Sequence, residues 1–349
     1  MKTVTIKDVA READVSVASV SRVLNGVGRV GEATRQKILS TAERLHYVPH
    51  AGARSLITRR TSTIGMVLPD FHGEFFSEML RGADGEARSR GLHLLVSTSH
   101  GDTEEAVAAI RSMRGRVDGM LVMSPHLDAD FVSAHLPAAL PAVLLNAPAI
   151  DGRPGINVEH YSGSAMMVRH LASNGRRRIA HIAGPIENTD AAERLRGYID
   201  ARPVPLDDRY VVHGDFSMAS GYAAAIALSR VDPLPEAIFA ANDMMAVGCI
   251  EGLRSVGLSV PGDIAVGGFD DIPLAALIQP ALTTMRIEVA ALGALALRRL
   301  ASLLEAVGDG EAGEDRIMPQ LVVRESCGTD QQSAADRRFG LDAARRAAS

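Results

Sequence analysis

The first 46 residues carry the apolar periodicity of short amphipathic helices. Thr5 and Asp8 form a capping-box pattern. Apolar residues follow at positions i, i+3, i+4 and i+7, namely Ile6, Val9, Ala10 and Ala13. This spacing predicts a first helix that begins after Thr5 and buries a single stripe.

Two further helices are predicted in the same stretch. Ser16 can cap a second helix whose inward residues are Val20, Val23 and Leu24, while Ala18 and Arg22 point the opposite way. Asn25-Gly26 is a pair suited to positive φ and ends that helix. A third helix is predicted from about Glu32 to Leu45. Two helices joined by a tight turn and braced by a third predict a helix-turn-helix unit.

The periodicity weakens between residues 47 and 60, where we predict a linker. Pro49 can start a short helix with Ala53, Leu56 and Ile57 on one side. Because so short a helix that includes Gly52 is unstable in water, we expect it to fold only against a partner.

From residue 62 onward, short apolar runs alternate with amphipathic helical stretches. This alternation predicts an α/β fold with parallel sheets covered by helices on both faces. About four β/α units before residue 150 are followed by a comparable set, which predicts two similar lobes and a cleft between them. The predicted strands are 64–68, 92–97, 119–123, 142–145, 179–183, 237–239 and 264–269.

Composition places the chain among globular proteins. Hydrophobic residues make up 46% and charged residues 23%, and no apolar run approaches the roughly 18 residues of a membrane span. The N-terminal sequence MKTVTIKDVAREADVS has no continuous apolar core, so we expect no secretory signal. Cys249 and Cys327 lack metal-ligand spacing and fit a reducing compartment. We therefore expect a cytoplasmic protein without a membrane partner.

Charge is divided unevenly along the chain. Residues 1–60 hold eleven Lys or Arg against five Asp or Glu, which gives them a net charge of +6. The whole chain has a net charge of −5, so residues 61–349 carry −11. A basic head on an acidic body indicates that the head meets a polyanion. The alternative is a solvated surface that happens to be basic.

One glycine pattern raises the question of a nucleotide cofactor. Residues 26–31 match G-x-G-x-x-G, but the segment before them has helical rather than strand periodicity, so the dinucleotide fold is not expected. The sequence contains no Walker A, G-x-S-x-G or H-E-x-x-H motif. We expect no cofactor, no metal site and no enzymatic activity.

The residue types of the second helix suit contact with DNA bases. Arg22 can bind guanine O6 and N7, and Val17 and Ala18 can contact a thymine methyl group. The alternative for Arg22 is an ordinary solvated residue. The candidate phosphate contacts are Thr5, Ser16, Ser19, Ser21, Asn25 and Thr34.

Several motifs together resemble the LacI/GalR family of transcriptional regulators. In the head and linker they are VTIKDVAREADVS (4–16), VSRVLNG (20–26), LHYVP (45–49) and ARSL (53–56). In the body they are VDGMLVM (117–123), IAGP (182–185), ANDMMAVG (241–248), GFD (268–270) and PALTT (280–284). The resemblance covers roughly residues 3–328, and the body looks most like the purine-repressor branch.

The resemblance implies a homodimer that binds a palindromic operator and a body shaped like a periplasmic sugar-binding protein. It implies a hinge helix that inserts Leu56 into the minor groove, with Ala53 and Ile57 beside it. A wedge of this kind kinks DNA most easily at a flexible pyrimidine–purine step. The implied organisation is a DNA-binding domain (1–46), a hinge (47–60), a body (61–328) and a disordered tail (329–349). The first lobe would hold 61–158 and 289–319, and the second 159–288 and 320–328.

By motif position, the same resemblance implies an effector site in the cleft. Its residues would be Phe75, Phe76, Asn146, Asp190, Arg194, Phe216, Asn242 and Asp270. Aromatic faces stack on a sugar or a base, and Arg, Asn and Asp bond polar edges. Purine-binding members of the family have an acidic–aromatic pair at the position of Asn146-Ala147. They also have an Arg at the position of Asn188. Both differences count against a purine as the effector of this chain. For Phe75 and Phe76 the alternative is a place in the core.

The sequence as a whole predicts a regulator, more specifically a repressor, whose operator affinity depends on a sugar or nucleoside. One rival is a solute-binding protein without a DNA role, since the body alone would resemble one. A second rival is a nucleotide-dependent oxidoreductase that relies on residues 26–31. The basic head counts against the first, and the helical segment before the glycines counts against the second.

Overall fold

The computed structural model describes residues 4–25, 29–47, 60–71, 73–124, 127–205, 207–305 and 313–328. Contacts divide the chain into two compact units: a head, formed by the chain up to Thr63 with Gly115–Asp118, and a body formed by the rest.

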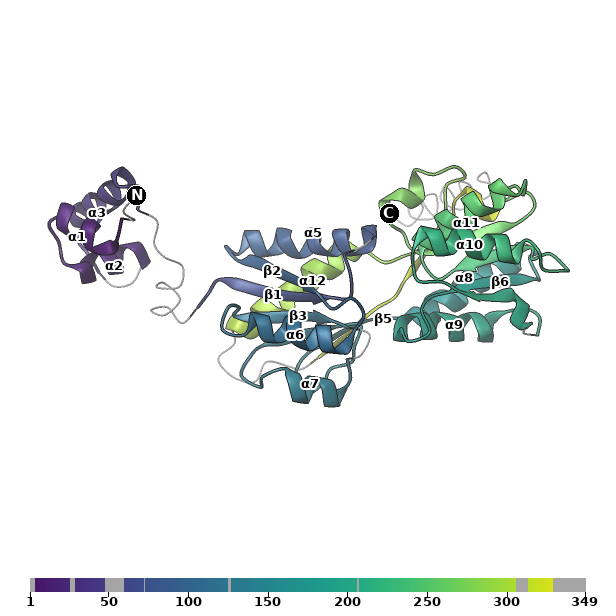
Figure 1. Cartoon of the computed structure of the whole chain (residues 1–349), viewed down its shortest axis with the longest axis horizontal. Coiled ribbons are helices and arrows are strands. Elements are labelled where there is room, and N and C mark those ends of the chain that lie inside the picture. Colours follow the sequence, from purple (N-terminus) through teal and green to yellow (C-terminus); the bar gives the residue numbers. More distant parts are fainter. Residues whose placement is uncertain are drawn as a thin grey trace, which may run out of the picture. The chain divides into compact units, whose positions relative to one another are not determined.

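The head contains the predicted helices α1 (Ile6–Glu12), α2 (Val17–Asn25) and α3 (Glu32–Arg44) (Figure 1). The Thr5–Asp8 capping box is present at α1, and the Ser16 hydroxyl accepts the Ser19 backbone N–H at 3.1 Å at the start of α2. Both caps supply partners for backbone N–H groups that a helix leaves unpaired. The three helices share one small core, whose fully buried members include Val9, Val20 and Ile38.

Some of the predictions concern residues that the structure does not describe. The hinge helix with Ala53, Leu56 and Ile57 lies outside the described residues, as do the glycines 26–28 and the tail 329–349. The backbone of Asn25 closes α2, but its side chain is outside the description.

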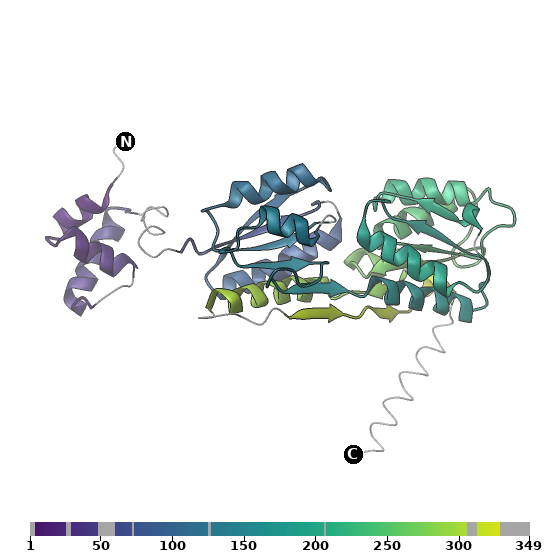
Figure 2. The same ribbon diagram turned by 90° about the horizontal axis from the view of Figure 1, so that it is seen from below.

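The first sheet of the body has the strand order β11-β5-β4-β3-β1-β2. Neighbouring strands from β11 to β1 pair in parallel. Its strands are β1 (Thr63–Leu68), β2 (His93–Thr98), β3 (Gly119–Met123), β4 (Ala142–Leu145), β5 (Gly155–Val158) and β11 (Glu314–Ile317). Helices α5 (Glu74–Ser89) and α12 (Val289–Glu305) cover one face, and α6 (Thr103–Met113) and α7 (Ala129–His135) cover the other (Figures 1 and 2).

The second sheet has the order β12-β10-β9-β8-β6-β7, with β12 antiparallel to β10 and the other pairs parallel. Its strands are β6 (Ile179–Ala183), β7 (Val211–His213), β8 (Ala237–Ala240), β9 (Ala265–Asp270), β10 (Thr283–Arg286) and β12 (Gln320–Val322). It is covered by α8 (His160–Ser173), α9 (Thr189–Ala201), α10 (Met218–Leu228) and α11 (Asp243–Ser255). The short 3-10 turns are η1 (Asp208–Tyr210), η2 (Pro273–Ala276) and η3 (Glu325–Cys327).

The chain passes between the two sheets three times in the described residues. It leaves the first sheet after β5, returns after β10 to form α12, and crosses again between β11 and β12. We call the part around each sheet the first and the second lobe. The predicted α/β class with parallel sheets and two lobes is confirmed.

Every predicted strand is present, and no bound is shifted by more than one residue. The described part of the chain contains no helix long and apolar enough to cross a bilayer.

Candidate functional site

The exposed face of α2 carries the residues predicted to contact DNA bases. Val17 is 41% exposed, and Ala18 and Arg22 are exposed beside it, while Val20 and Val23 of the same helix are buried in the head core. The first turn of α2 contains no acidic residue. Its positive N-terminal end is therefore not offset by a carboxylate of its own.

The predicted phosphate contacts already have local roles in the head. The Thr5 hydroxyl donates to Asp8 at 2.7 Å, and the hydroxyls of Ser16 and Ser19 lie 2.9 Å apart. Ser21 and Thr34 are half-buried, Thr34 in the first turn of α3. Apart from Ser21, which lies in the middle of α2, these hydroxyl groups lie at helix starts, where backbone N–H groups and side chains commonly meet phosphates.

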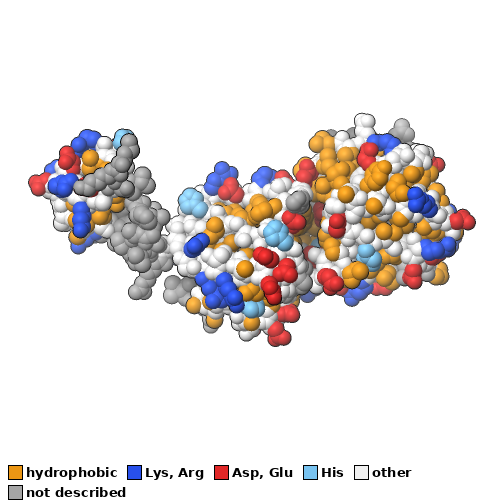
Figure 3. Space-filling model, viewed as in Figure 1, with side chains coloured by type: hydrophobic (Ala, Val, Ile, Leu, Met, Phe, Trp, Pro, Cys, Tyr) orange, Lys and Arg blue, Asp and Glu red, His pale blue; other side chains and the backbone are white. Residues whose placement is uncertain are grey.

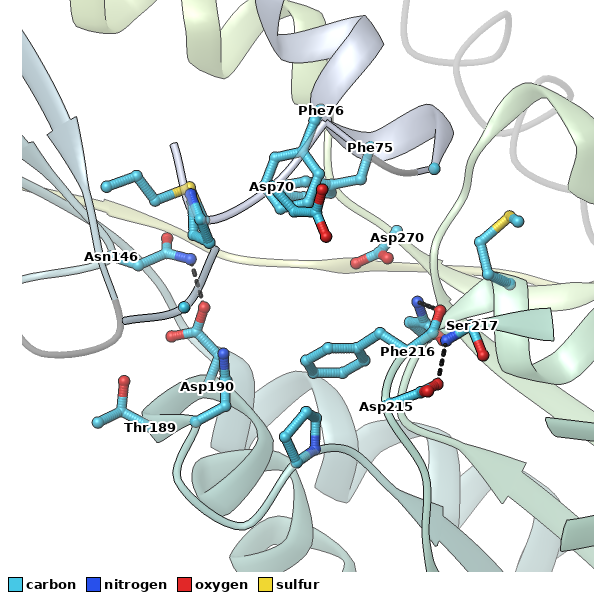
Figure 4. Close-up of a pocket in the computed structure, with 18 of the residues that line it drawn as sticks. Asp70, Phe75, Phe76, Asn146, Thr189, Asp190, Asp215, Phe216, Ser217 and Asp270 are labelled. Atoms are coloured by element: carbon cyan, nitrogen blue, oxygen red, sulfur yellow. Dashed lines mark hydrogen bonds between the residues drawn. The ribbon is translucent and has the colours of Figure 1, made fainter. Parts of the chain in front are cut away.

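The body contains a cavity of about 600 Å³ between its two lobes. Its walls come from segments that follow strands of both sheets, the usual place for a ligand in open α/β sheets. Figure 4 shows the Phe216 ring pointing into the space between Asn146 and Asp270. All eight residues assigned by motif position line this cavity: Phe75, Phe76, Asn146, Asp190, Arg194, Phe216, Asn242 and Asp270.

Phe75 and Phe76 of α5 belong both to the core and to the cavity wall, the two alternatives that the sequence left open. Their rings pack edge to face with centroids 5.3 Å apart, and both lie half-buried against the main core while lining the cavity. Such a pair can present an apolar wall to a ring-shaped ligand.

Three of the eight predicted cavity residues have backbones in the left-handed region. The φ angles are 53° for Asn146, 68° for Phe216 and 114° for Asp270. Side chains rarely tolerate these angles, and such residues cluster at functional sites when the surrounding fold holds them. Here residues with these backbone angles bring an amide, an aromatic ring and a carboxyl group to the wall of the same cavity.

Arg194 is the centre of a buried polar network in the second lobe. Its Nε donates to His160 Nδ1 at 3.2 Å, one terminal nitrogen donates to the Ala241 carbonyl, and the other lies 3.5 Å from Asp270 Oδ1. The guanidinium also stacks 4.1 Å from the centroid of the Phe269 ring. These contacts fix the Arg194 side chain before any ligand arrives.

Asp190 connects this network to the first lobe. It accepts a 2.5 Å hydrogen bond from Asn146 Nδ2 across the cleft and lies 3.4 Å from His160 Nε2 (Figure 4). Burial would raise the pKa of Asp190, but His160, Arg194 and Asn146 outweigh it and hold the pKa below its usual value. Burial lowers the pKa of His160 despite the neighbouring carboxylate.

Asp270 has the opposite behaviour at the end of β9. Burial raises its pKa to about 7, and the nearby Arg194 only partly offsets this effect. A buried carboxyl group that can be neutral or charged near pH 7 therefore lines the cavity.

The sequence reasoning missed several residues that line the cavity. Asp70, Asp215 and Glu187 add carboxyl groups, and Ser217 caps α10 at its edge. Asp70 follows β1 by two residues, so its position after a buried strand was a usable signal. His160 gave no such signal, because only the tertiary structure brings it to Arg194. No group of three His, Cys, Asp or Glu in the described residues could hold a metal ion.

Two family models match the chain. The model of bacterial regulatory proteins of the lacI family matches residues 5–50, and that of the periplasmic binding protein-like domain matches residues 168–327.

Curated relatives and a solved structure are similar along nearly the whole chain. The ribose operon repressor of Escherichia coli (strain K12) is 36% identical over 84% of this chain and 91% of its own length. The HTH-type transcriptional repressor PurR of Photobacterium profundum is 34% identical over 92% and 98%, respectively. The crystal structure of the Lac repressor dimer bound to operator and the anti-inducer ONPF matches with a TM-score of 0.82 at 29% identity, covering 93% of this chain and 99% of that one.

Proposed function

The chain belongs to the lacI family of bacterial regulatory proteins, and from this premise we propose that it is a transcriptional repressor whose operator affinity is controlled by a small-molecule effector. The observation that carries the proposal is the presence, in one chain, of a helix-turn-helix head with an exposed α2 face and a body with a lined cavity. A solute-binding protein needs the second of these features but not the first.

The head reads the operator through α2. Arg22 donates to a guanine edge in the major groove, and Val17 and Ala18 contact a neighbouring thymine methyl group. The hydroxyl groups of Thr5, Ser16, Ser19, Ser21 and Thr34, with the amide of Asn25, hold the phosphates and fix the register. The hinge inserts Leu56, flanked by Ala53 and Ile57, into the minor groove at the centre of the site.

The effector is a sugar or a nucleoside that occupies the cavity. A relative that is named as a ribose operon repressor supports the sugar class. Phe75, Phe76 and Phe216 offer apolar surfaces, and Asn146, Asp190, Asn242 and Asp270 offer polar atoms around them. A few convergent polar groups among aromatic walls are the usual composition of a small-molecule site.

The protein acts as a homodimer on a palindromic operator in the cytoplasm, and not as an enzyme. The second lobe exposes Met218, Tyr222 and Val256 on or beside α10 and α11, where hydrophobic side chains gather in Figure 3. An apolar patch on a soluble protein is typical of an interface, and the Lac repressor in the similar structure is a dimer on its operator.

Arg22→Ala tests the role of the head. We expect it to weaken binding to a selected operator by about 1–3 kcal/mol and to relax discrimination at one base pair per half-site. Arg44→Ala is the matched control, because it removes the same charge from an exposed arginine of α3 that pairs with Glu12. Equal losses in the two variants would mean that only total charge matters.

Salt dependence and truncation provide a second test of the head. Binding by the full chain should weaken steeply with salt as phosphate counterions are released. The chain shortened to residues 61–328 should stay folded and dimeric but lose operator affinity. A salt-insensitive complex, or operator binding by the shortened chain, would contradict the proposal.

A further inference from the structure

The charge of the cavity restricts the class of effector it can hold. Among the described residues that line it, five carry carboxyl groups, and one, Arg194, carries a permanent positive charge. The carboxyl groups are those of Asp70, Glu187, Asp190, Asp215 and Asp270. His100 also lines the cavity, with its ring 3.0 Å from the Thr98 hydroxyl. On the face shown in Figure 3, acidic side chains gather along the boundary between the two lobes.

Arg194 cannot offset this charge for a ligand. Its guanidinium contacts Asp270 and the Ala241 carbonyl within its own lobe, and it is only 5% exposed. The neighbouring carboxyl group of Asp270 weakens the attraction between Arg194 and an anionic ligand.

Helix N-termini are the other common source of anion binding, and four of them meet the cavity. Three are closed by the helix's own capping side chain. Asn188 accepts the Ala191 N–H at α9, Ser217 accepts the Ser220 N–H at α10, and Asn242 accepts the Met245 N–H at α11. The donors that would hold a phosphate are thus partly occupied by the chain itself.

Acidic residues oppose anions at two of these helix ends. Asp190 lies in the first turn of α9, and Glu74 begins α5. A carboxylate in the first turn complements the positive end of the helix dipole, so the dipole has little left for a ligand. The Glu74 carboxylate in addition accepts the Leu274 N–H at 2.9 Å.

We propose that the cleft takes a neutral, hydroxyl-rich ligand and excludes its phosphorylated or carboxylated counterparts. Ionised carboxylates only accept hydrogen bonds, and sugar hydroxyl groups supply the donors that they require. A phosphate group instead brings up to two negative charges and only acceptor oxygens at pH 7. The inference rests on the proposed function, because it concerns the site assigned there to the effector.

Matched pairs of compounds test this selectivity on the full-length protein. The neutral members are ribose, glucose, cellobiose and adenosine, and the charged members are their terminal phosphates together with glucuronate. Thermal shift identifies binding, and titration calorimetry at low salt gives each Kd. We expect at least one neutral member to bind, and its charged partner to bind at least about tenfold more weakly. A charged member that binds as tightly as its neutral partner, or a set in which no neutral member binds, overturns the inference.

A charge-neutralising variant tests the physical cause. Asp70→Asn combined with Asp215→Asn removes two of the carboxylates while keeping acceptor oxygens in place. We expect the ratio of the charged to the neutral Kd to fall by about three- to tenfold, because screened charges at this range contribute on the order of 1 kcal/mol. Asp263→Asn is the control, since this exposed carboxylate accepts from Ser259 as Asp215 does from Ser217, but lies outside the cavity lining. An unchanged ratio in the double variant contradicts the charge argument.

Operator binding measured in the same samples separates this inference from the proposed function. A phosphorylated compound that binds in the cleft as tightly as its neutral partner and alters operator affinity would overturn the selectivity and leave the function standing. A neutral ligand that binds without any effect on operator affinity would support the selectivity and contradict effector control.

Discussion

Asp270 is a carboxyl group held in two opposing environments. Burial and the charge of Asp190 favour its neutral form, while Arg194 at 3.5 Å favours the charged form. Because burial dominates, the folded protein binds this proton more tightly than the unfolded chain does. The residue that ends β9 therefore links the stability of the body to pH.

The sign of this linkage is testable with Asp270→Asn. The pKa rises from 3.8 in the unfolded chain to about 7 in the folded body. The contribution of Asp270 is then most favourable below the unfolded pKa and falls as the pH rises to about 7. The free energy of unfolding of the wild type minus that of the variant should decrease between these values, by up to about 1.4 kcal/mol per pH unit. Urea unfolding at several pH values measures it.

Asp263→Asn is the control for this titration. Hydrogen bonds from Ser259 lower the pKa of exposed Asp263, so its charge is constant over most of the same window. The difference between wild type and this variant should stay nearly flat above the usual Asp range. A flat curve for Asp270→Asn as well would show that Asp270 is ionised throughout.

Arg194→Ala tests whether the buried network also serves the effector. A methyl group cannot replace a guanidinium that positions polar groups on three sides. We expect operator affinity without effector to be near normal and effector affinity to fall at least tenfold, or ~1.4 kcal/mol. The control is Arg196→Ala, which removes an exposed arginine of α9 that pairs with Glu193. An unchanged effector response in Arg194→Ala would mean that this residue only stabilises its lobe.

At the scale of elements, α5 and α12 pack backbone against backbone on the first sheet. A Cβ atom at Gly82 would lie 1.8 Å from the Ala290 carbonyl oxygen, and one at Gly293 would lie 2.2 Å from the Met79 carbonyl oxygen. Neither contact can be relieved by turning a side chain, so both glycines are required by the closeness of the two helices.

Gly82→Ala and Gly85→Ala form a matched pair on α5. We expect Gly82→Ala to destabilise the body by about 3 kcal/mol, because the new methyl group meets backbone. Gly85 lies in the same helix, and a methyl group added to it would have no atom within 4 Å. Its replacement by Ala should stabilise by about 0.5–1 kcal/mol through helix propensity. Denaturant midpoints measure the change in stability of each variant. Equal changes in Gly82→Ala and Gly85→Ala would contradict the packing argument.

At the scale of the whole body, the two lobes are joined by more than the crossing strands. Asn146 of the first lobe donates to Asp190 of the second, and Leu274 N–H of the second donates to Glu74 of the first. Both contacts lie at residues that line the cavity or adjoin it. A ligand that alters them would change the relative stability of lobe arrangements by no more than its differential affinity for those arrangements.

At the same scale, we predict that the protein is a dimer and not a tetramer. After Thr329 the sequence offers only Phe339 and Leu341 as large apolar residues and has no heptad repeat, so the tail should not make a tetramer. Sedimentation should find a dimer with or without residues 329–349. Val256→Asp should weaken the dimer by placing a charge in the apolar patch, while Met166→Asp, at another exposed apolar residue, should not. A tetramer that persists after deletion of the tail would overturn the prediction.

The sequence alone determined the elements whose signals are local. The helices of the head followed from caps and from apolar spacing within a few residues, and Ser16 and Thr5 are found where those patterns placed them. The longer apolar strands were likewise visible, because a strand buried on both faces is apolar throughout. The cavity residues could be assigned by family motifs, which place them after particular strands.

Only the tertiary structure decided the remaining elements and the chemistry of the cleft. β11 reads Glu-Asp-Arg-Ile and is a strand because β5 pairs with it in parallel, about 160 residues away in the chain. The meeting of Asp270 with Arg194, and of Asn146 with Asp190, depends on the strand order and on the closure of two lobes. Pairing partners, burial and pKa are properties of neighbours brought together in space, and no local pattern contains them.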